Sequence, residues 1–254
     1  MNGPTLYPKI NNLLRILLRD YQAVLGDELI AFYLHGSLAL GDFDIEHSDI
    51  DYLVVTKGHL STVGEDQLAR IRLRFHGSGI PLAMRMDGLR TTESAIRRYQ
   101  PGRVPLQNGP MVYSNELDAW GSQSVIDRYI VRNYGITLTG PSPTSLIDPI
   151  SPDDLRQAVK ATVNESWASY LDENSIWFCD PSFPFTVVVR LCRVLYTLER
   201  GETASKPASV RWAQEALEPR WQRLIRQIMQ ENWGNAEVDE VINLLRHVVE
   251  RCQM

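Results

Sequence analysis

The stretch FYLHGSLALGDFDIEHSDIDYLVVT, residues 32–56, limits the possible folds of this chain more than any other segment. An apolar, strand-like run ends at Gly36-Ser37, and a second such run begins at Asp49 and Asp51. Side chains two residues apart in a strand project from the same face, so the two carboxylates lie side by side. Carboxylates that close repel each other unless a cation lies between them. The stretch therefore predicts two buried strands with a charged site where the runs meet.

The same residues favour a site for a nucleotide triphosphate and its metal ion. Mg²⁺ takes oxygen ligands and keeps positions open for phosphate oxygens, so it would relieve the repulsion between Asp49 and Asp51. Gly36 allows a phosphate group to approach the backbone, and Ser37 offers a hydroxyl and an N–H group. A short helix beginning in LALGDF would direct its N-terminus toward an anion. The other interpretation is that the two acids are solvated carboxylates at a strand edge.

Asp87 is the third acidic residue that we assign to this site. Residues 79–88 alternate apolar and other side chains, which predicts a strand with Asp87 on the face opposite the apolar one. On a strand beside that of Asp49 and Asp51 it would either bind the metal or take a proton from an attacking hydroxyl. Both roles stay open, and so does the simpler interpretation of a surface acid in the turn before Gly88.

Apolar periodicity divides the first part of the chain into helices and strands. Leucine and isoleucine recur at helical spacing between Pro4 and Gly26, which predicts an amphipathic helix. Short β-branched and aromatic runs predict buried strands, and Gly135 ends a later helix. The predicted elements are a helix over 7–25, strands over 28–35, 50–56 and 79–88, and helices over 62–77 and 122–135.

From Ser151 onward every periodic segment is helical. Ser151 can cap a helix, and Pro152 can occupy its first position. Helices are predicted at about 153–170, 184–200, 207–216, 219–232 and 236–251. We therefore expect an α+β chain, in which a mixed sheet with flanking helices over residues 1–150 precedes a C-terminal α-helical bundle over 151–254.

Composition narrows the classes of function. The 254 residues carry a formal charge of −5, without the basic footprint of a nucleic-acid-binding surface. A mildly acidic surface tolerates a cationic small substrate. Cys179, Cys192 and Cys252 have no metal-binding spacing, which indicates a reduced setting, and no apolar run is long enough to span a membrane. We expect a cytoplasmic monomer that binds neither nucleic acid nor membranes.

Two segments resemble known enzyme families. HGSLALGDFDIEHSDIDYLVV, residues 35–55, resembles the signature of the DNA polymerase β-like nucleotidyltransferases, in which Gly-Ser precedes Asp-x-Asp and a later strand supplies a third acid. Residues 187–217 are similar to the C-terminal helical region of the aminoglycoside 3″/9-adenylyltransferases, in which an arginine and a lysine reach the ATP phosphates. Arg193 and Lys206 occupy the matching positions. Residues 134–141 resemble that family's interdomain stretch.

The chain departs from that family at several positions. The family usually has a glutamate as third acid and general base, where this chain has Asp87. An acid that hydrogen-bonds the drug corresponds to a place around Phe183, and Asp180 lies three residues earlier. An aromatic residue that contacts the aminoglycoside corresponds to Met111 or Tyr113. The nucleotide half of the resemblance is therefore closer than the acceptor half.

Trp177 and Asp180 are the acceptor-binding residues that the sequence suggests. Trp177 lies near Asp172, Glu173 and Asp180, and an acidic, aromatic cleft suits a polyamine sugar. Packing is the simpler explanation for tryptophan, and we expect it for most of the six in the chain. No histidine is assigned a catalytic role, because the five are scattered and His35 serves equally well as a strand-end residue.

The resemblance implies an ATP- and Mg²⁺-dependent adenylyltransferase. It would transfer AMP to a hydroxyl group of a small cationic acceptor, such as an aminoglycoside or aminocyclitol antibiotic, and its two domains would close over the nucleotide. Two alternatives stay open: a transferase that modifies a protein or another small molecule, and a nucleotide-binding protein without turnover. The assigned residues are Asp49, Asp51 and Asp87 for two Mg²⁺ ions and the chemistry, and Gly36, Ser37, Arg193 and Lys206 for the nucleotide.

Overall fold

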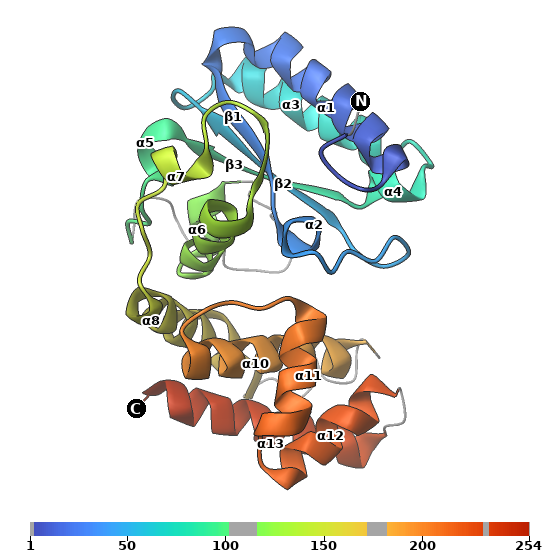
Figure 1. Cartoon of the computed structure of the whole chain (residues 1–254), viewed down its shortest axis with the longest axis vertical. Coiled ribbons are helices and arrows are strands. Elements are labelled where there is room, and N and C mark those ends of the chain that lie inside the picture. Colours follow the sequence, from blue (N-terminus) through green and yellow to red (C-terminus); the bar gives the residue numbers. More distant parts are fainter. Residues whose placement is uncertain (1–2, 102–115, 172–181, 231–233, 254) are drawn as a thin grey trace. The chain divides into compact units, whose positions relative to one another are not determined.

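The computed structural model describes residues 3–101, 116–171, 182–230 and 234–253 (Figure 1). The chain divides into two compact units. The first comprises Met1–Trp120 and Asp127–Pro149, and the second comprises Gly121–Ile126 and Ile150–Met254.

A mixed sheet of β1 (Leu29–Leu34), β2 (Ile50–Thr56), β3 (Met86–Thr92) and β4 (Ile136–Thr139) forms the centre of the first unit. The strand order is β3-β2-β1-β4. β1 is antiparallel to β2 and to β4, whereas β2 and β3 are parallel. The helices of this unit are α1 (Pro8–Leu25), α2 (Gly36–Leu40), α3 (Thr62–His76), α4 (Pro81–Met84), α5 (Glu93–Ile96), α7 (Pro143–Leu146) and, from Asp127 onward, α6 (Gln123–Tyr134).

Helices cover both faces of this sheet (Figure 1). On one face α1 and α3 pack against strand residues such as Phe32 and Tyr52. On the other face Val131 of α6 packs against Tyr33 and Leu53. Because successive strand residues alternate between the faces, β1 and β2 contribute to both cores. A parallel pair of strands needs a crossover, and α3 lies in the one between β2 and β3.

The strand predicted over residues 79–88 is wrong in most of its length. Pro81 begins the short helix α4 instead, where its fixed backbone angle and missing N–H cost nothing. The strand β3 starts at Met86 and extends through Thr92, so its C-terminal half was missed. The alternation of apolar residues was misleading because Met84 is 49% exposed and does not belong to a buried strand face. Asp87 nevertheless lies on the third strand.

The edge strand β4 was not predicted. It has four residues and pairs with β1 alone among the described strands. Ile136 and Leu138 pack against the core on the α1 side. A run this short is below the length at which alternation can be recognised, and only the pairing with β1 identifies it.

The second unit is helical. Ser151 and Asp154 form a reciprocal capping box at the start of α8, as the Ser151-Pro152 pair predicted. The helix then changes to a π-helical turn, Val163–Trp167, and a 3₁₀ turn, Ala168–Leu171, where a continuous helix was expected. The helices are α8 (Pro152–Thr162), α10 (Phe183–Arg200), α11 (Lys206–Ala216), α12 (Pro219–Met229) and α13 (Asn235–Gln253).

The expected α+β class, a mixed sheet with helices followed by a helical bundle, is confirmed. The core of the bundle is built from apolar residues of α10, α12 and α13, with Leu191, Ile225 and Leu245 among the most buried. Within the described ranges, no helix is both long and apolar enough to cross a membrane.

Candidate active site

Two of the predicted acids lie side by side on the sheet. Asp51 of β2 is the register partner of Asp87 of β3, so both side chains project from the same face of the parallel pair. The neighbouring β2 residue on that face is Leu53, which packs on the α6 side. Asp49 precedes β2 by one residue and is exposed. Asp51 is half-buried and Asp87 is exposed, so the acids mark a solvent-accessible end of the sheet.

Asp87 binds its proton more tightly than an ordinary aspartate. Desolvation raises the pKa of Asp87, and the negative charge of Asp49 raises it further. His35, His76 and a hydrogen bond from the backbone of Gly88 act in the opposite direction. A carboxylate with a raised pKa is better suited to accept a proton at neutral pH. The effect of Asp49 is the one expected of a neighbouring like charge.

Gly36 lies directly beneath the carboxylate of Asp51. A Cβ atom at residue 36 would lie 1.8 Å from Oδ2 of Asp51, so no side chain fits there. The φ angle of Gly36 is 61°, a conformation that other residues adopt only with strain. The backbone N–H of His35 donates to the carbonyl of Asp51 over 3.0 Å, which ties the end of β1 to the start of β2. The sequence prediction that Gly36 and Asp51 share one site is consistent with this contact.

Ser37 is the second residue of α2 and is half-buried. The helix has five residues and begins at Gly36 itself, two residues earlier than the LALGDF segment suggested. The backbone carbonyl of Ser37 accepts the N–H groups of Gly41 and Asp42, which closes the turn that leads toward Asp49. Ser37 therefore stands beside the Gly36–Asp51 contact.

Two further residues near the acids were not assigned to the site from the sequence. His35 is 7% exposed, and among the described residues its Nε2 atom has no hydrogen-bond partner. Burial lowers the pKa of His35, while Asp127 and Asp87 act to raise it. Asp127 lies on α6, one turn before Val131, whose side chain packs against the sheet. The signal for Asp127 was its spacing of four residues from that apolar position.

A buried ion pair fixes α6 on this face of the sheet. Arg128 is 1% exposed and pairs with Asp118, which is 4% exposed. Its guanidinium also donates to the backbone carbonyls of Ile96, over 3.0 Å, and Ala95, over 2.9 Å. These bonds join α6 to the end of α5 and thereby set the position of the neighbouring Asp127.

The acidic residues fit a metal ion that binds together with a nucleotide. No group of three or more His, Cys, Asp or Glu side chains within the described ranges is arranged to hold a metal ion by itself. Mg²⁺ in nucleotide-dependent enzymes is usually held by one or two carboxylates plus substrate phosphates and water, not by an all-protein cage. Asp49 and Asp51 supply that number of carboxylates, with a glycine backbone beside them.

Arg193 and Lys206 belong to consecutive helices of the helical unit, α10 and α11. Nε of Arg193 on α10 donates to the carbonyl of Ala204 over 3.3 Å. Ser205 then caps α11 by accepting the N–H of Ala208, and Lys206 is the first residue of that helix. Arg193 is half-buried and Lys206 is exposed. The hydrogen bond from Arg193 therefore reaches the α10–α11 connection two residues before Lys206.

The predicted acceptor-binding residues, Trp177 and Asp180, lie outside the described residues, as do Met111 and Tyr113. The packing role expected for most tryptophans is observed for Trp167 and Trp221, which are 9% and 4% exposed and belong to the core of the helical unit.

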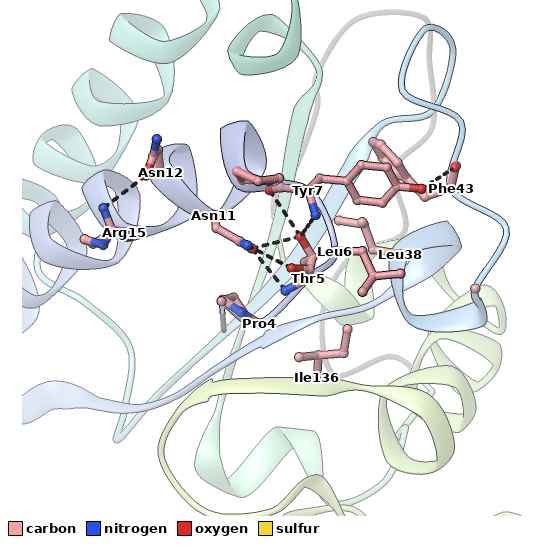
Figure 2. A pocket seen from close by; sticks show the side chains of 13 residues that line it. Pro4, Thr5, Leu6, Tyr7, Asn11, Asn12, Arg15, Leu38, Phe43 and Ile136 are labelled. Atoms are coloured by element: carbon pink, nitrogen blue, oxygen red, sulfur yellow. Dashed lines mark hydrogen bonds between the residues drawn. The ribbon is translucent and has the colours of Figure 1, made fainter. Parts of the chain in front are cut away.

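A cavity of about 710 Å³ lies elsewhere in the first unit (Figure 2). It is lined by the segment around Tyr7 and by Leu38 and Phe43, and Tyr7 Oη donates to the carbonyl of Phe43. Leu38 belongs to the core on the α1 side of the sheet, whereas Asp51 and Asp87 belong to the α6 side. None of the acids lines this cavity, so it is distinct from the candidate site.

Two family models match the chain in the order of its two units. The model described as "Nucleotidyltransferase domain" matches residues 10–79, and "Aminoglycoside adenylyltransferase, C-terminal domain" matches residues 145–253. The two units therefore match, in order, the two parts of an aminoglycoside 3″/9-adenylyltransferase-like nucleotidyltransferase. The chain is an enzyme of the nucleotidyltransferase class, and the family resemblance predicted from the sequence is confirmed.

Relatives with curated functions support this assignment. An aminoglycoside (3″) (9) adenylyltransferase of Escherichia coli is 28% identical over 222 residues, which cover 82% of this chain and 80% of the relative. A spectinomycin 9-adenylyltransferase of Staphylococcus aureus (strain Mu50 / ATCC 700699) is 26% identical over 220 residues, covering 81% and 78% of the two chains.

A solved structure shares the fold. Spectinomycin adenyltransferase AAD(9) from Enterococcus faecialis, determined with ATP and spectinomycin, matches with a TM-score of 0.68 at 19% identity. The match covers 94% of this chain and 98% of the other. The match extends over both units, so the sheet unit and the helical unit each share the fold of the corresponding part of that enzyme.

Proposed function

We propose that this enzyme transfers AMP from ATP to a hydroxyl group of a small cationic acceptor, an aminoglycoside or aminocyclitol antibiotic, and releases pyrophosphate. The observation that carries the proposal is the pairing of Asp51 with Asp87 directly above the side-chain-free Gly36. This arrangement offers carboxylates for metal-bound phosphates and a backbone that phosphate can approach. The named activities of the E. coli and S. aureus relatives support the choice of acceptor class.

Asp49 and Asp51 are the proposed ligands of the Mg²⁺ ions, two of which we expect with the nucleotide. When bound, the metal neutralises phosphate charge and polarises the phosphoryl group that is attacked. Asp51 is suited to this role because the backbone bond from His35 and the contact with Gly36 fix the start of its strand. Asp49 is exposed and adds its charge at the solvent side.

Asp87 is the proposed general base. The acceptor hydroxyl attacks the α-phosphorus of ATP, its proton passes to the carboxylate of Asp87, and the bond to the pyrophosphate leaving group breaks. The raised pKa of Asp87 makes it a stronger base than an ordinary aspartate. Its adjacency to Asp51 also allows the alternative role of metal ligand.

The remaining assigned residues bind the two substrates. Ser37 is the proposed hydrogen-bond donor to the triphosphate, and Arg193 and Lys206 are its proposed cationic contacts, since charge-assisted bonds to phosphate are the strongest available to side chains. Trp177 and Asp180 are the proposed contacts of the acceptor. A formal charge of −5 for the chain is compatible with a cationic acceptor.

Pyrophosphate release tests the proposal directly. The purified chain is incubated with ATP and Mg²⁺ and a panel of antibiotics that includes streptomycin and spectinomycin. We expect release with one or two members of the panel, and a loss of at least a hundredfold in the variant Asp49→Asn, in line with the removal of a group that stabilises transition-state charge. Asp66→Asn, an exposed acid on α3, is the matched control.

An Asp49→Asn variant with the wild-type rate would refute the assigned chemistry. Release of pyrophosphate without any panel antibiotic but with cell lysate would indicate a protein or another small-molecule acceptor. A chain that binds ATP and releases no pyrophosphate with any acceptor would be a non-catalytic nucleotide-binding relative.

A further inference from the structure

One side of α10 is polar, whereas most of its remaining surface is buried among apolar residues. The polar positions follow one another at intervals of four, three and four residues, which aligns them along one stripe of the helix. The only acidic residue of α10, Glu199, lies outside this stripe. The polar stripe of α10 consists of Thr186, Arg190, Arg193 and Thr197.

Arg190 of this stripe is held by an aromatic ring. Its guanidinium carbon lies 5.2 Å from the centroid of Trp167, a geometry that favours a cation. Trp167 is buried, and Tyr170 contacts it edge-on with the ring centroids 5.6 Å apart. Trp167 is the last residue of the π-helical turn that interrupts the helix after α8. Such π-helical turns are rare in proteins, and those that occur frequently lie at functional sites.

Arg190 has a charge that the described part of the chain does not balance. Other arginines, such as Arg128 and Arg156, pair with aspartates within 4.0 Å, but no ion pair within the described ranges includes Arg190. Desolvation lowers the pKa of Arg190, opposed by Tyr170, although the residue as a whole is exposed to solvent. An anion from solution can therefore reach the guanidinium, and it would stabilise the cation.

Arg190 and Arg193 lie three residues apart on α10. Like charges at this spacing repel across one helical turn, and a multiply charged anion that binds both would remove the repulsion. A phosphate chain presents several oxygens to planar guanidinium groups, which bind them in pairs. We infer that Arg190 is a further phosphate-binding residue, which joins Arg193 and Lys206 in holding the β- and γ-phosphates that leave as pyrophosphate.

This inference rests on the proposed function for the identity of the anion, but its central test does not require turnover. The full chain is titrated with inorganic pyrophosphate and, separately, with AMP, by calorimetry. The variant Arg190→Met removes the charge and retains a flexible apolar stem against Trp167. Arg190→Lys retains the charge without the planar group. Arg223→Met replaces an exposed arginine of α12 and is the matched control.

We expect Arg190→Met to weaken pyrophosphate binding about tenfold, as the loss of one charge-assisted contact predicts. AMP binding should change by less than about twofold, because AMP lacks the two phosphates. Arg190→Lys should lie between wild type and Arg190→Met, and Arg223→Met should match wild type. In the pyrophosphate-release assay with ATP, Mg²⁺ and an antibiotic acceptor, Arg190→Met should raise KM for ATP by a similar factor.

Wild-type pyrophosphate affinity in a folded Arg190→Met chain would overturn the inference. If that variant does not fold, Arg190→Gln decides the question by the same titration. Equal weakening by Arg223→Met would also overturn it, because the effect would then reflect net charge alone. Pyrophosphate binding that depends on Arg190 in a chain without adenylyl transfer would refute the proposed function and sustain the inference. Adenylyl transfer by Arg190→Met with an unchanged KM for ATP would refute the inference about Arg190 and leave the proposed function standing.

Discussion

The carboxylate of Asp51 occupies the volume that any side chain at residue 36 would need. The requirement for glycine is thus both steric and conformational, since φ of Gly36 is also positive. Gly41 has a positive φ too, but nothing lies within 4 Å of the place where its Cβ would be. The difference separates a glycine that only a turn requires from one that the contact with Asp51 also requires.

Gly36→Ala should therefore abolish activity. The new methyl group must displace the Asp51 carboxylate, and the positive φ adds strain of roughly 1–3 kcal/mol. We expect pyrophosphate release to fall by at least about a hundredfold and the thermal unfolding midpoint to drop by several degrees. Gly58→Ala is the control, because open space surrounds that position. Wild-type activity in Gly36→Ala would show that Asp51 need not lie above residue 36.

The ionised carboxylate of Asp87 should lower the stability of the folded chain at neutral pH while it supports activity. Its pKa is raised in the folded chain, so the folded state holds this proton more tightly than the unfolded state. Ionisation of Asp87 consequently opposes folding at neutral pH, and the opposition disappears as the pH falls through the raised pKa to the ordinary value. Asp87→Asn should unfold at a higher temperature than wild type at pH 7, measured by calorimetry without metal, and at nearly the same temperature at pH 3.

The same Asp87→Asn variant should lose about 10²- to 10⁴-fold in kcat, the usual contribution of a general base. If Asp87 is instead a metal ligand, the variant should require more Mg²⁺ for half-maximal rate and recover activity at high Mg²⁺. A pH–rate profile of the wild type should lose activity on the acidic side at a pH above the ordinary range of aspartate, because only the ionised carboxylate accepts the proton. Unchanged activity in Asp87→Asn would exclude both roles.

At the scale of elements, α6 depends on a single buried arginine. Arg128 bonds two backbone carbonyls at the end of α5 and pairs with Asp118, all away from water. Removing one member of such a pair leaves an uncompensated buried charge. The position of α6 in turn determines where Asp127 stands relative to His35.

Arg128→Met should therefore lower the free energy of unfolding by about 3–5 kcal/mol, as measured by urea denaturation. The double variant Arg128→Met/Asp118→Leu should recover part of this loss, because it leaves no unpaired carboxylate. A single variant within about 0.5 kcal/mol of wild type would show that the pair does not anchor α6.

Elements with strong local signals were predicted correctly, and those fixed by tertiary pairing were not. The helices α1, α3 and α6 and the strands β1 and β2 have periodic apolar residues and clear ends, and they agree with the prediction within one or two residues. β3 was misplaced because Pro81 starts a helix within an alternating segment. β4 was missed because only its pairing with β1 marks it.

The candidate site shows the same division. The spacing of Asp49 and Asp51 and the Gly36-Ser37 turn are local features, and the sequence was sufficient to group them. His35 and Asp127 come together only when α6 packs on the sheet. Arg190 was passed over because its partner ring, Trp167, lies more than twenty residues earlier in the chain. Which charged and aromatic groups surround a side chain can be determined only from the three-dimensional structure.

At the scale of the whole molecule, metal binding and nucleotide binding should depend on each other. The described part of the chain holds no ready-made cluster of three ligands, and Asp49 is exposed to water. A hydrated Mg²⁺ ion gains little from two carboxylates alone, but much more when phosphate oxygens complete its ligands. Asp87, whose pKa is raised by desolvation and then by the charge of Asp49, adds negative charge that also opposes binding of an unaccompanied triphosphate.

Thermal unfolding measured with each ligand separately and with both together tests this coupling. Mg²⁺ alone at millimolar concentration should raise the unfolding midpoint by less than about 1 °C, and ATP with EDTA should have a similarly small effect. ATP and Mg²⁺ together should raise it by several degrees, since a ligand at a hundred times its Kd contributes about 2.7 kcal/mol. Ca²⁺ in place of Mg²⁺ is the control for charge, because its looser coordination should support binding more than turnover. A large shift with Mg²⁺ alone would mean that the protein forms a metal site without the nucleotide, and the acids would then act as a structural cage before they act on ATP.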